Sequence, residues 1–343
     1  MTEAPRGTPD PEVLYAPYLS FLGVPADWHP PQGLRAALLP LPYDLTTSYQ
    51  PGARRGPLAI LEASTHLELF DEELGVEPWQ EIGVATLPPV VPDTSGPAAT
   101  LARIRQIAGE VVAGGKFLAG LGGEHSVTAP LVQAVRSRHP QLGVLQLDAH
   151  ADLRDTFEGS PHNHACVMHR LLDEGVRVAQ VGVRSLTREE RELIAARRIC
   201  TVFAAEAVGS PVATWLERVL QALPEEVYVT VDVDVFDPSV MPATGTPEPG
   251  GLDWYRVLAV LRGVALAKRI VGFDVVELAP IPGLVAPDFL AAKLVYKLFA
   301  YAFLLRHEKA AAARERSAGE MPQAGGDSLR LGHGGVDDLS HGG

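Results

Sequence analysis

The chain has 343 residues, 46% of them hydrophobic, which is enough for one large α/β domain or two smaller ones. Its 42 acidic residues outnumber its 29 basic ones, and the formal net charge of −13 argues against a nucleic-acid partner. The two cysteines, Cys166 and Cys200, exclude a disulfide framework and fit a reducing cytosol. No secretory signal follows Met1, and the late apolar segment at residues 294–305 is too short to span a bilayer. We therefore expect a cytoplasmic protein without a membrane partner.

Residues 1–33 are rich in proline and carry scattered aromatic side chains, so we expect an arm lying on a surface. From residue 34 onward, short apolar runs alternate with longer segments that have helical apolar spacing. The short runs predict strands at residues 36–40, 117–121, 143–147, 178–183, 201–203, 227–231 and 270–276. The longer segments predict helices at residues 59–73, 98–113, 128–138, 164–174, 188–198, 212–222, 253–267 and 287–306.

Uninterrupted apolar strands separated by helices indicate a parallel sheet that helices cover on both faces. The sequence therefore predicts an α/β fold: a single three-layer α/β/α domain over residues 34–307, with a doubly wound, mainly parallel sheet. Residues 308–343 lack apolar periodicity and are rich in alanine, arginine, glycine, serine and aspartate. We expect them to form a disordered C-terminal tail.

Three side chains of the ligand type stand at alternate positions directly after the predicted strand at residues 143–147. They are Asp148, His150 and Asp152. In extended backbone, alternate residues point to the same side, so these three side chains can converge on one point. Two carboxylates beside an imidazole repel one another unless a cation lies among them, and this ligand mixture suits a divalent metal such as Mn²⁺ or Zn²⁺.

Two other predicted strands end in similar residues. The strand at residues 117–121 leads into His125, and the strand at residues 227–231 leads into Asp232 and Asp234. In open α/β sheets, ligands bind in the crevice beyond the carboxyl ends of the strands, so all three sets should meet there. Together they supply four carboxylates and two imidazoles, more than one ion needs if it keeps a position open for water. Two ions sharing bridging carboxylates would use all six.

The chain resembles the ureohydrolase (arginase/agmatinase) family, in matching order from about residue 36 to residue 305. The similarity rests on Gly-Gly-Glu-His-Ser at 122–126, Asp-Ala-His-Ala-Asp at 148–152, Thr-Val-Asp-Val-Asp-Val-Phe-Asp-Pro at 230–238, Thr-Gly-Thr-Pro at 244–247 and Gly-Phe-Asp-Val-Val-Glu at 272–277. It implies an arginase-like fold and a centre of two Mn²⁺ ions per subunit. By position, His125, Asp148, Asp152 and Asp232 would hold one ion. His150, Asp148, Asp232 and Asp234 would hold the other.

The resemblance also implies roles in catalysis and substrate binding. Glu277, after the last strand, matches the family carboxylate that anchors the cationic guanidinium group. His164 matches the histidine at the mouth of the site, and histidine titrates in the range that suits proton transfer to a leaving amine. On sequence alone, His162 and His169 are rivals for that role. Thr246 is expected to line the guanidinium pocket, and Asn163 is a candidate contact for the substrate.

The segment at residues 160–165 indicates which guanidine is cleaved. Family arginases hold the amino-acid end of arginine with Ser-Gly-Asn-x-His-Gly, whereas this chain reads Ser-Pro-His-Asn-His-Ala. This difference argues against arginine as the substrate. It favours the agmatinase branch, which converts agmatine to putrescine and urea in polyamine biosynthesis. N1-aminopropylagmatine (which would give spermidine), guanidinobutyrate and formiminoglutamate remain alternatives.

Two readings from other classes remain. One is a metal-binding regulator that kept the fold without catalysis. The other is a metal-dependent deacetylase on a related fold, which the two-metal ligand set disfavours. The family commonly forms trimers or hexamers, so a homo-oligomer is expected.

Overall fold

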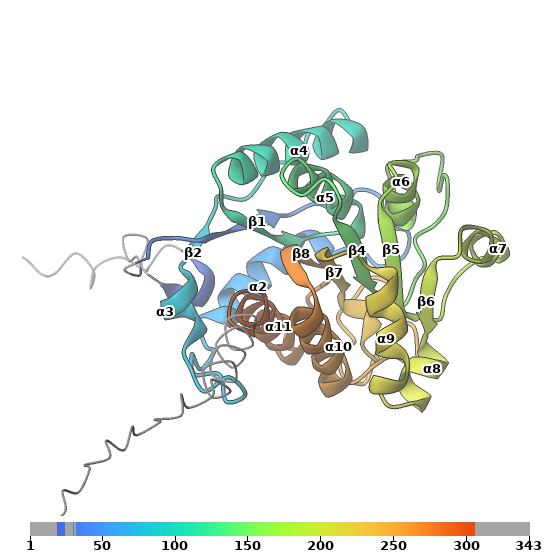
Figure 1. Cartoon of the computed structure of the whole chain (residues 1–343). Coiled ribbons are helices and arrows are strands. Elements are labelled where there is room, and N and C mark those ends of the chain that lie inside the picture. Colours follow the sequence, from blue (N-terminus) through green and yellow to red (C-terminus); the bar gives the residue numbers. More distant parts are fainter. Residues whose placement is uncertain (1–18, 25–29, 31, 306–343) are drawn as a thin grey trace, which may run out of the picture.

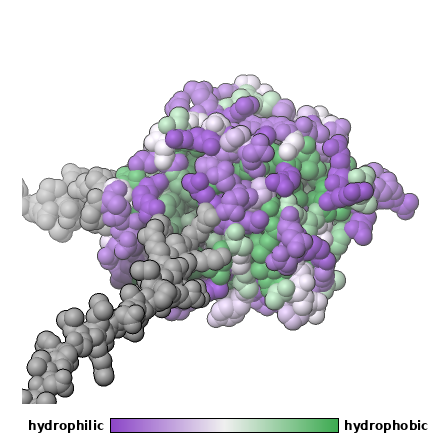
Figure 2. All heavy atoms as spheres, viewed as in Figure 1, coloured by the Kyte–Doolittle hydropathy of each residue, from purple (hydrophilic) through white to green (hydrophobic). Residues whose placement is uncertain are grey.

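The computed structural model describes residues 19–24, 30 and 32–305. A central sheet lies between two layers of helices (Figure 1). Figure 2 shows that hydrophilic residues cover much of the viewed face, with apolar residues between them. This distribution is expected when each helix turns an apolar stripe toward the sheet and leaves its polar face to solvent. The predicted three-layer α/β/α architecture is confirmed.

The sheet has eight strands in the order β2-β1-β3-β8-β7-β4-β5-β6, and every pairing is parallel. The strand bounds are β1 Ala36–Leu41, β2 Val84–Thr86, β3 Phe117–Gly122, β4 Gly143–Leu147, β5 Arg177–Val183, β6 Cys200–Phe203, β7 Glu226–Asp232 and β8 Arg269–Val276. β1 and β4 are buried along their whole length, and β7 and β8 are buried after their first residue, which explains their continuous apolar sequences.

Each face of the sheet has its own apolar core. One core gathers residues of α2 (Gly56–Ser64), α8 (Ala204–Gly209), α9 (Ala213–Ala222), α10 (Trp254–Ala267) and α11 (Ala286–Phe303). The other gathers residues of α4 (Pro97–Ala113), α5 (Thr128–Arg136), α6 (Val167–Asp173) and α7 (Arg188–Arg197). Adjacent strand residues alternate between the cores: Leu38 joins the first and Leu39 the second. The sheet is therefore doubly wound.

The predicted elements agree with the structure apart from one helix and three short segments. The helix expected at residues 59–73 ends at Ser64. The hydroxyls of Ser64 and Thr65 donate to the carbonyls of Leu61 and Glu62, 2.7 and 2.8 Å away. Such side-chain hydrogen bonds compete with the backbone hydrogen bonds that would continue the helix. The short elements α3 (Pro78–Ile82), β2 and α8 were not predicted, because three to six residues carry too little periodicity.

The predicted arm and tail fall largely outside the described residues. Within the arm, Phe21 is buried and its ring centroid lies 6.0 Å from that of Phe299 in α11. The predicted tail at residues 308–343 lies outside the described part entirely. Among the described helices, none is long and apolar enough to cross a membrane.

Four strands that carry the candidate ligands are neighbours in the middle of the sheet, in the order β3, β8, β7 and β4. Because all four run parallel, their carboxyl ends meet at the same edge. The loops that follow them therefore form the floor of one crevice, as expected for an open α/β sheet.

Candidate metal centre and substrate cavity

His125 begins the short helix η3 (His125–Val127) after β3, and its placement depends on Gly123. The backbone passes so close to Tyr43 that a Cβ on Gly123 would lie 1.8 Å from the Tyr43 carbonyl oxygen. The Gly123 amide donates to Leu41, 2.8 Å away, and its carbonyl accepts from Glu277, 2.7 Å away. Only glycine permits this approach, which joins the ends of β1, β3 and β8.

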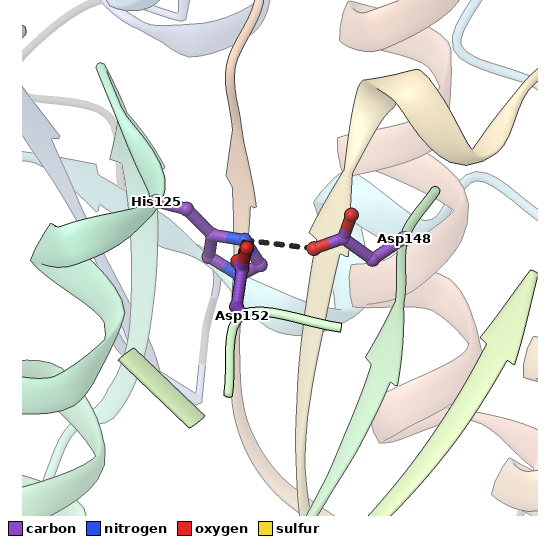
Figure 3. Close-up of side chains that lie close together, drawn as sticks. All are labelled: His125, Asp148 and Asp152. Atoms are coloured by element: carbon purple, nitrogen blue, oxygen red, sulfur yellow. Dashed lines mark ion pairs between the residues drawn. The ribbon is translucent and has the colours of Figure 1, made fainter. Parts of the chain in front are cut away.

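The first ligand group consists of His125, Asp148 and Asp152 (Figure 3). The Nδ1 atom of His125 lies 3.0 Å from Oδ2 of Asp148 and 2.9 Å from Oδ2 of Asp152. Oδ2 of Asp232, from the end of β7, lies 3.4 Å from the same nitrogen. All four side chains are buried. The structure thus brings together four of the predicted ligands around one point.

The second ligand group consists of Asp148, His150 and Asp234. Nδ1 of His150 lies 2.9 Å from Oδ2 of Asp234 and 3.6 Å from Oδ1 of Asp148. Asp148 therefore turns one oxygen toward His125 and the other toward His150, as a bridging carboxylate would. The second oxygen of Asp232 instead accepts from the amide of Asp234, 2.9 Å away.

The electrostatics of these groups fit divalent cations. Burial raises the pKa of Asp152 to about 7, and the charge of Asp148 adds to the effect. Burial alone would lower the pKa of His150, but the charges and hydrogen bonds of Asp234 and Asp148 together outweigh it and raise the pKa to about 12. Nδ1 of His125 is buried without a hydrogen-bond partner of acceptable geometry, although three carboxylates face it. A cation among these atoms would relieve the carboxylate repulsion and use the imidazole lone pair.

Two hydrogen-bond chains inside the sheet orient the ligands. Nε2 of His125 lies 2.9 Å from the hydroxyl of Thr230, which donates to Asp274 at 2.6 Å. With Thr230 donating to the carboxylate, its oxygen accepts from Nε2, which leaves the Nδ1 lone pair free for a metal. Asp274 thus supports a proposed ligand through Thr230.

The second chain crosses β6, β5 and β4. Thr201 donates to Gln180 at 2.9 Å, Gln180 to Gln146 at 2.7 Å, and Gln146 to Oδ2 of Asp148 at 2.7 Å. Sequence reasoning missed these residues. A polar side chain within an otherwise apolar strand, as at Gln146 and Gln180, was the available signal.

Glu277 lies at the inner end of a cavity that we call the inner cavity. It is lined by Thr47, Ser48, His125, His150, Asp152, His164, Asp232, Asp234, Gly245, Thr246 and Glu277. Glu277 has a φ of 66°, and its Oε1 accepts from the amide of His125, 2.6 Å away. Burial raises the pKa of Glu277 well above its ordinary value, and the charge of Glu124 adds to this. A cationic partner would favour the ionised carboxylate.

An outer vestibule of about 300 Å³ adjoins the inner cavity. The two share His150, Asp152, His164 and Thr246 among their walls, together with Ser48. His164 therefore lies at the passage between them. Its rivals do not: His162 is exposed and faces another groove, and Nδ1 of His169 lies 2.7 Å from the carbonyl of Leu153.

His164 is held by residues that sequence reasoning did not identify. Its amide donates to the hydroxyl of Thr46 at 3.2 Å, and the Thr46 hydroxyl donates to Glu124 at 2.5 Å. Glu124 is fully buried, which raises its pKa to about 7. Burial lowers the pKa of His164 to about 4, so its imidazole is neutral at pH 7.

The structure does not bring Asn163 to either cavity. Its side chain is buried and accepts from the amide of Ala165, 3.0 Å away, as the N-cap of helix η4 (His164–Cys166). The neighbouring loop supplies a wall that sequence did not predict. Thr47 lines the inner cavity, and its buried hydroxyl has no hydrogen-bond partner among the described residues.

Comparisons with known proteins agree with this geometry. The sequence profile of the arginase family matches residues 34–300. An N(1)-aminopropylagmatine ureohydrolase from Synechocystis sp. is 42% identical over 270 residues, covering 77% of this chain and 88% of the relative. An agmatinase from Pyrococcus horikoshii is 38% identical over 247 residues, covering 71% and 83%. The crystal structure of the agmatine ureohydrolase of Thermoplasma volcanium superposes with a TM-score of 0.73 at 30% identity, covering 80% of this chain and 92% of that one.

Replacing Thr230 by valine should weaken metal binding without unfolding the protein. The change keeps the side-chain shape but removes the hydroxyl that lies between His125 and Asp274. Loss of such a supporting contact costs roughly ten- to a hundredfold in metal affinity. Titration with Mn²⁺ measures the effect. Thr100→Val, which removes a buried hydroxyl far from the ligands, is the control. Equal affinities in both variants would contradict the orienting role.

Metal binding should release protons and weaken as the pH falls. The pKa values of His125 and His150 lie above neutrality when no cation is present, so both imidazoles carry protons that a metal must displace. Lowering the pH from about 8 to 6 strengthens this competition. Calorimetric titration with Mn²⁺ in two buffers of different ionisation enthalpy counts the released protons. Binding heats that are identical in both buffers, with an affinity independent of pH, would refute the expectation.

Proposed function

The chain belongs to the arginase family, and from that premise we propose that it hydrolyses the guanidinium group of N1-aminopropylagmatine to urea and spermidine, with agmatine as the second candidate. As a member of the agmatinase branch it is a ureohydrolase, a hydrolase acting on guanidino C–N bonds. The observation that carries the proposal is the meeting of two ligand groups, which share Asp148, with Glu277 in one cavity.

We propose that the site holds two Mn²⁺ ions. The carboxylate-rich ligand set with two imidazoles suits this metal. One ion would be held by His125, Asp148, Asp152 and Asp232, and the other by His150, Asp148, Asp232 and Asp234. The opposed oxygens of Asp148 support its role as a bridge. When bound, two such cations supply a hydroxide nucleophile near neutral pH.

Glu277 would anchor the guanidinium group. Two metal cations in the cavity would repel this cationic group, so a carboxylate must offset the repulsion. The amide of His125 fixes one oxygen of Glu277 and leaves Oε2 on the side of Gly245. Gly245 and Thr246 line the cavity beside it, and the free hydroxyl of Thr47 offers a further contact to the planar N–H groups. These residues would orient the guanidinium carbon for attack.

His164 would carry a proton to the departing amine. The imidazole is neutral at pH 7 because burial lowers its pKa to about 4. This pKa lies below the range expected from the sequence, so at pH 7 the imidazole must first accept a proton within the site before it can donate one to the amine. Its place between the inner cavity and the outer vestibule is where the chain of the leaving amine would lie.

The preference among guanidines rests on two observations. The segment that in arginases would hold an α-carboxylate is turned elsewhere: Asn163 caps a helix and His162 is exposed at another groove. The Synechocystis relative named for aminopropylagmatine is also more similar to this chain than the Pyrococcus agmatinase, at 42% against 38% identity. Both favour an amine-ended substrate, and the second favours the longer one over the agmatine expected from the sequence.

We also propose a cytoplasmic homo-oligomer, a trimer or hexamer, acting in polyamine biosynthesis. Cys166 and Cys200 are free thiols, as expected in a reducing compartment. Several apolar side chains are exposed near the N-terminus of α11, among them Val285 at 72% and Phe289 at 42%. Exposed apolar groups of this kind suit contact with a second copy.

Urea release by the Mn²⁺-loaded protein tests the substrate. We expect the highest kcat/KM for N1-aminopropylagmatine, then agmatine, with arginine and guanidinobutyrate at least about tenfold lower, because unpaired or repelled polar groups reduce transition-state binding. A preference for arginine would overturn the amine-ended assignment. Absence of urea from all four substrates would overturn the proposed function.

Replacing His164 by asparagine should lower kcat about a hundredfold while leaving the metal content unchanged, because proton transfer contributes on that scale. The matched control is His162→Asn, two residues away and exposed outside the cavity. Steady-state kinetics with agmatine and metal analysis measure both effects. Equal activity of the two variants would remove His164 from the mechanism.

A further inference from the structure

One carboxylate in the outer vestibule has no role in the fold or in the proposed chemistry. The charged or titratable groups that line the vestibule are His150, Asp152, Arg154, His164, Glu190 and Glu248. Asp152 and His150 belong to the ligand groups, and His164 lies at the passage. That leaves Arg154, Glu190 and Glu248 to determine the charge that a substrate chain meets outside the metal centre.

Two of these three groups are already engaged. Glu190 uses both oxygens in main-chain contacts, accepting from the amides of Leu153 at 2.9 Å and Thr187 at 2.7 Å. The guanidinium of Arg154 lies over the ring of Phe157, with its Cζ 4.3 Å from the centroid. The side chain of Glu248, in contrast, has no hydrogen bond or ion pair with any described residue, and it is partly buried.

The backbone around Glu248 is held rigidly although its side chain is free. Pro247 and Pro249 flank it and restrict φ on both sides. The guanidinium of Arg184 donates to the carbonyls of Glu248 at 2.7 Å and Pro249 at 3.0 Å. The carboxylate of Asp237 then accepts from the amide of Gly250 at 2.9 Å. The fixed backbone keeps the carboxylate at the wall of the vestibule, so only the rotamer freedom of the side chain is lost when it binds a ligand.

Arg184 also ties this segment to the metal centre. The same guanidinium donates to the carbonyl of Asp234, a proposed ligand, at 2.7 Å. The position of Glu248 is therefore fixed relative to the inner cavity, where Thr246 lies two residues earlier in the same segment. A ligand whose guanidinium group binds at Glu277 would extend its chain past Thr246 into the vestibule that Glu248 lines.

We propose that Glu248 receives an ammonium group on the tail of the substrate, so that the outer vestibule selects guanidines with a cationic chain. This inference rests on the proposed function. A guanidine that ends in a carboxylate would meet repulsion at the same place, since like charges in a confined site disfavour binding. Glu248 thus acts as a specificity residue, apart from the groups that carry out hydrolysis.

The variant Glu248→Gln tests this with two substrates of similar length and opposite tail charge, agmatine and guanidinobutyrate. We expect kcat/KM for agmatine and N1-aminopropylagmatine to fall about tenfold, mainly through KM, since a charged hydrogen bond is lost. The value for guanidinobutyrate should stay the same or rise. Glu192→Gln, at an exposed position of α7 away from the vestibule, is the matched control. A uniform fall for all substrates, or no change for the amines, would overturn the inference.

A binding measurement separates this inference from the proposed function. Spermidine, which carries the same amine tail without the guanidinium group, is titrated calorimetrically into the Mn²⁺-loaded wild type and the variant. About tenfold weaker binding to Glu248→Gln supports the ammonium subsite even if no guanidine is hydrolysed. Equal affinity for both proteins overturns the subsite even if the wild type releases urea.

Discussion

The mutual repulsion of buried carboxylates is the constraint on which the rest of this structure depends. Asp148, Asp152, Asp232 and Asp234 are all buried at the carboxyl edge of one sheet, and burial together with the neighbouring carboxylates raises the pKa values of Asp152 and Asp232. Such an arrangement is stable only if positive charge lies among the oxygens. Two imidazoles face them directly, and divalent cations would neutralise them more completely. The strand order makes the arrangement possible, because β3, β8, β7 and β4 are neighbours and end on the same side.

Polar side chains inside the sheet hydrogen-bond to the ligands at this edge, in addition to the apolar side chains that form the core. One hydrogen-bond chain runs from Thr201 through Gln180 and Gln146 to Asp148 across three strands. A second holds His125 through Thr230 and Asp274. The buried side chains of Gln146, Gln180, Thr230 and Asp274 are all hydrogen-bonded, so they rigidify the sheet beneath the ligands. Ligands held in this way are preorganised, which limits the cost of ordering the site when metal binds.

Around the rigid centre, loops decide what the site accepts. The segment at residues 44–48 positions His164 through Thr46 and offers the hydroxyl of Thr47, and the segment at residues 244–250 carries Thr246 and Glu248. Asn163, a candidate substrate contact from the sequence, instead caps a helix outside both cavities. We therefore propose that the strand ends supply the hydrolytic groups, whereas the loops select the guanidine.

The sequence by itself determined the layered α/β fold and the metal-binding character of the chain. Apolar runs alternating with helical patterns left few other topologies, and Asp148, His150 and Asp152 at alternate positions imply convergence from local geometry alone. Only the tertiary structure decided the rest. Glu124, Thr46 and Gln180 act through partners far along the chain, so no local pattern reports them. Asn163 is a polar residue that sequence alone makes a candidate substrate contact, but its side-chain oxygen accepts a hydrogen bond from the backbone amide of Ala165 instead. Whether a polar residue faces a cavity or caps a helix depends on competing hydrogen-bond partners, and only the folded chain determines which partner prevails.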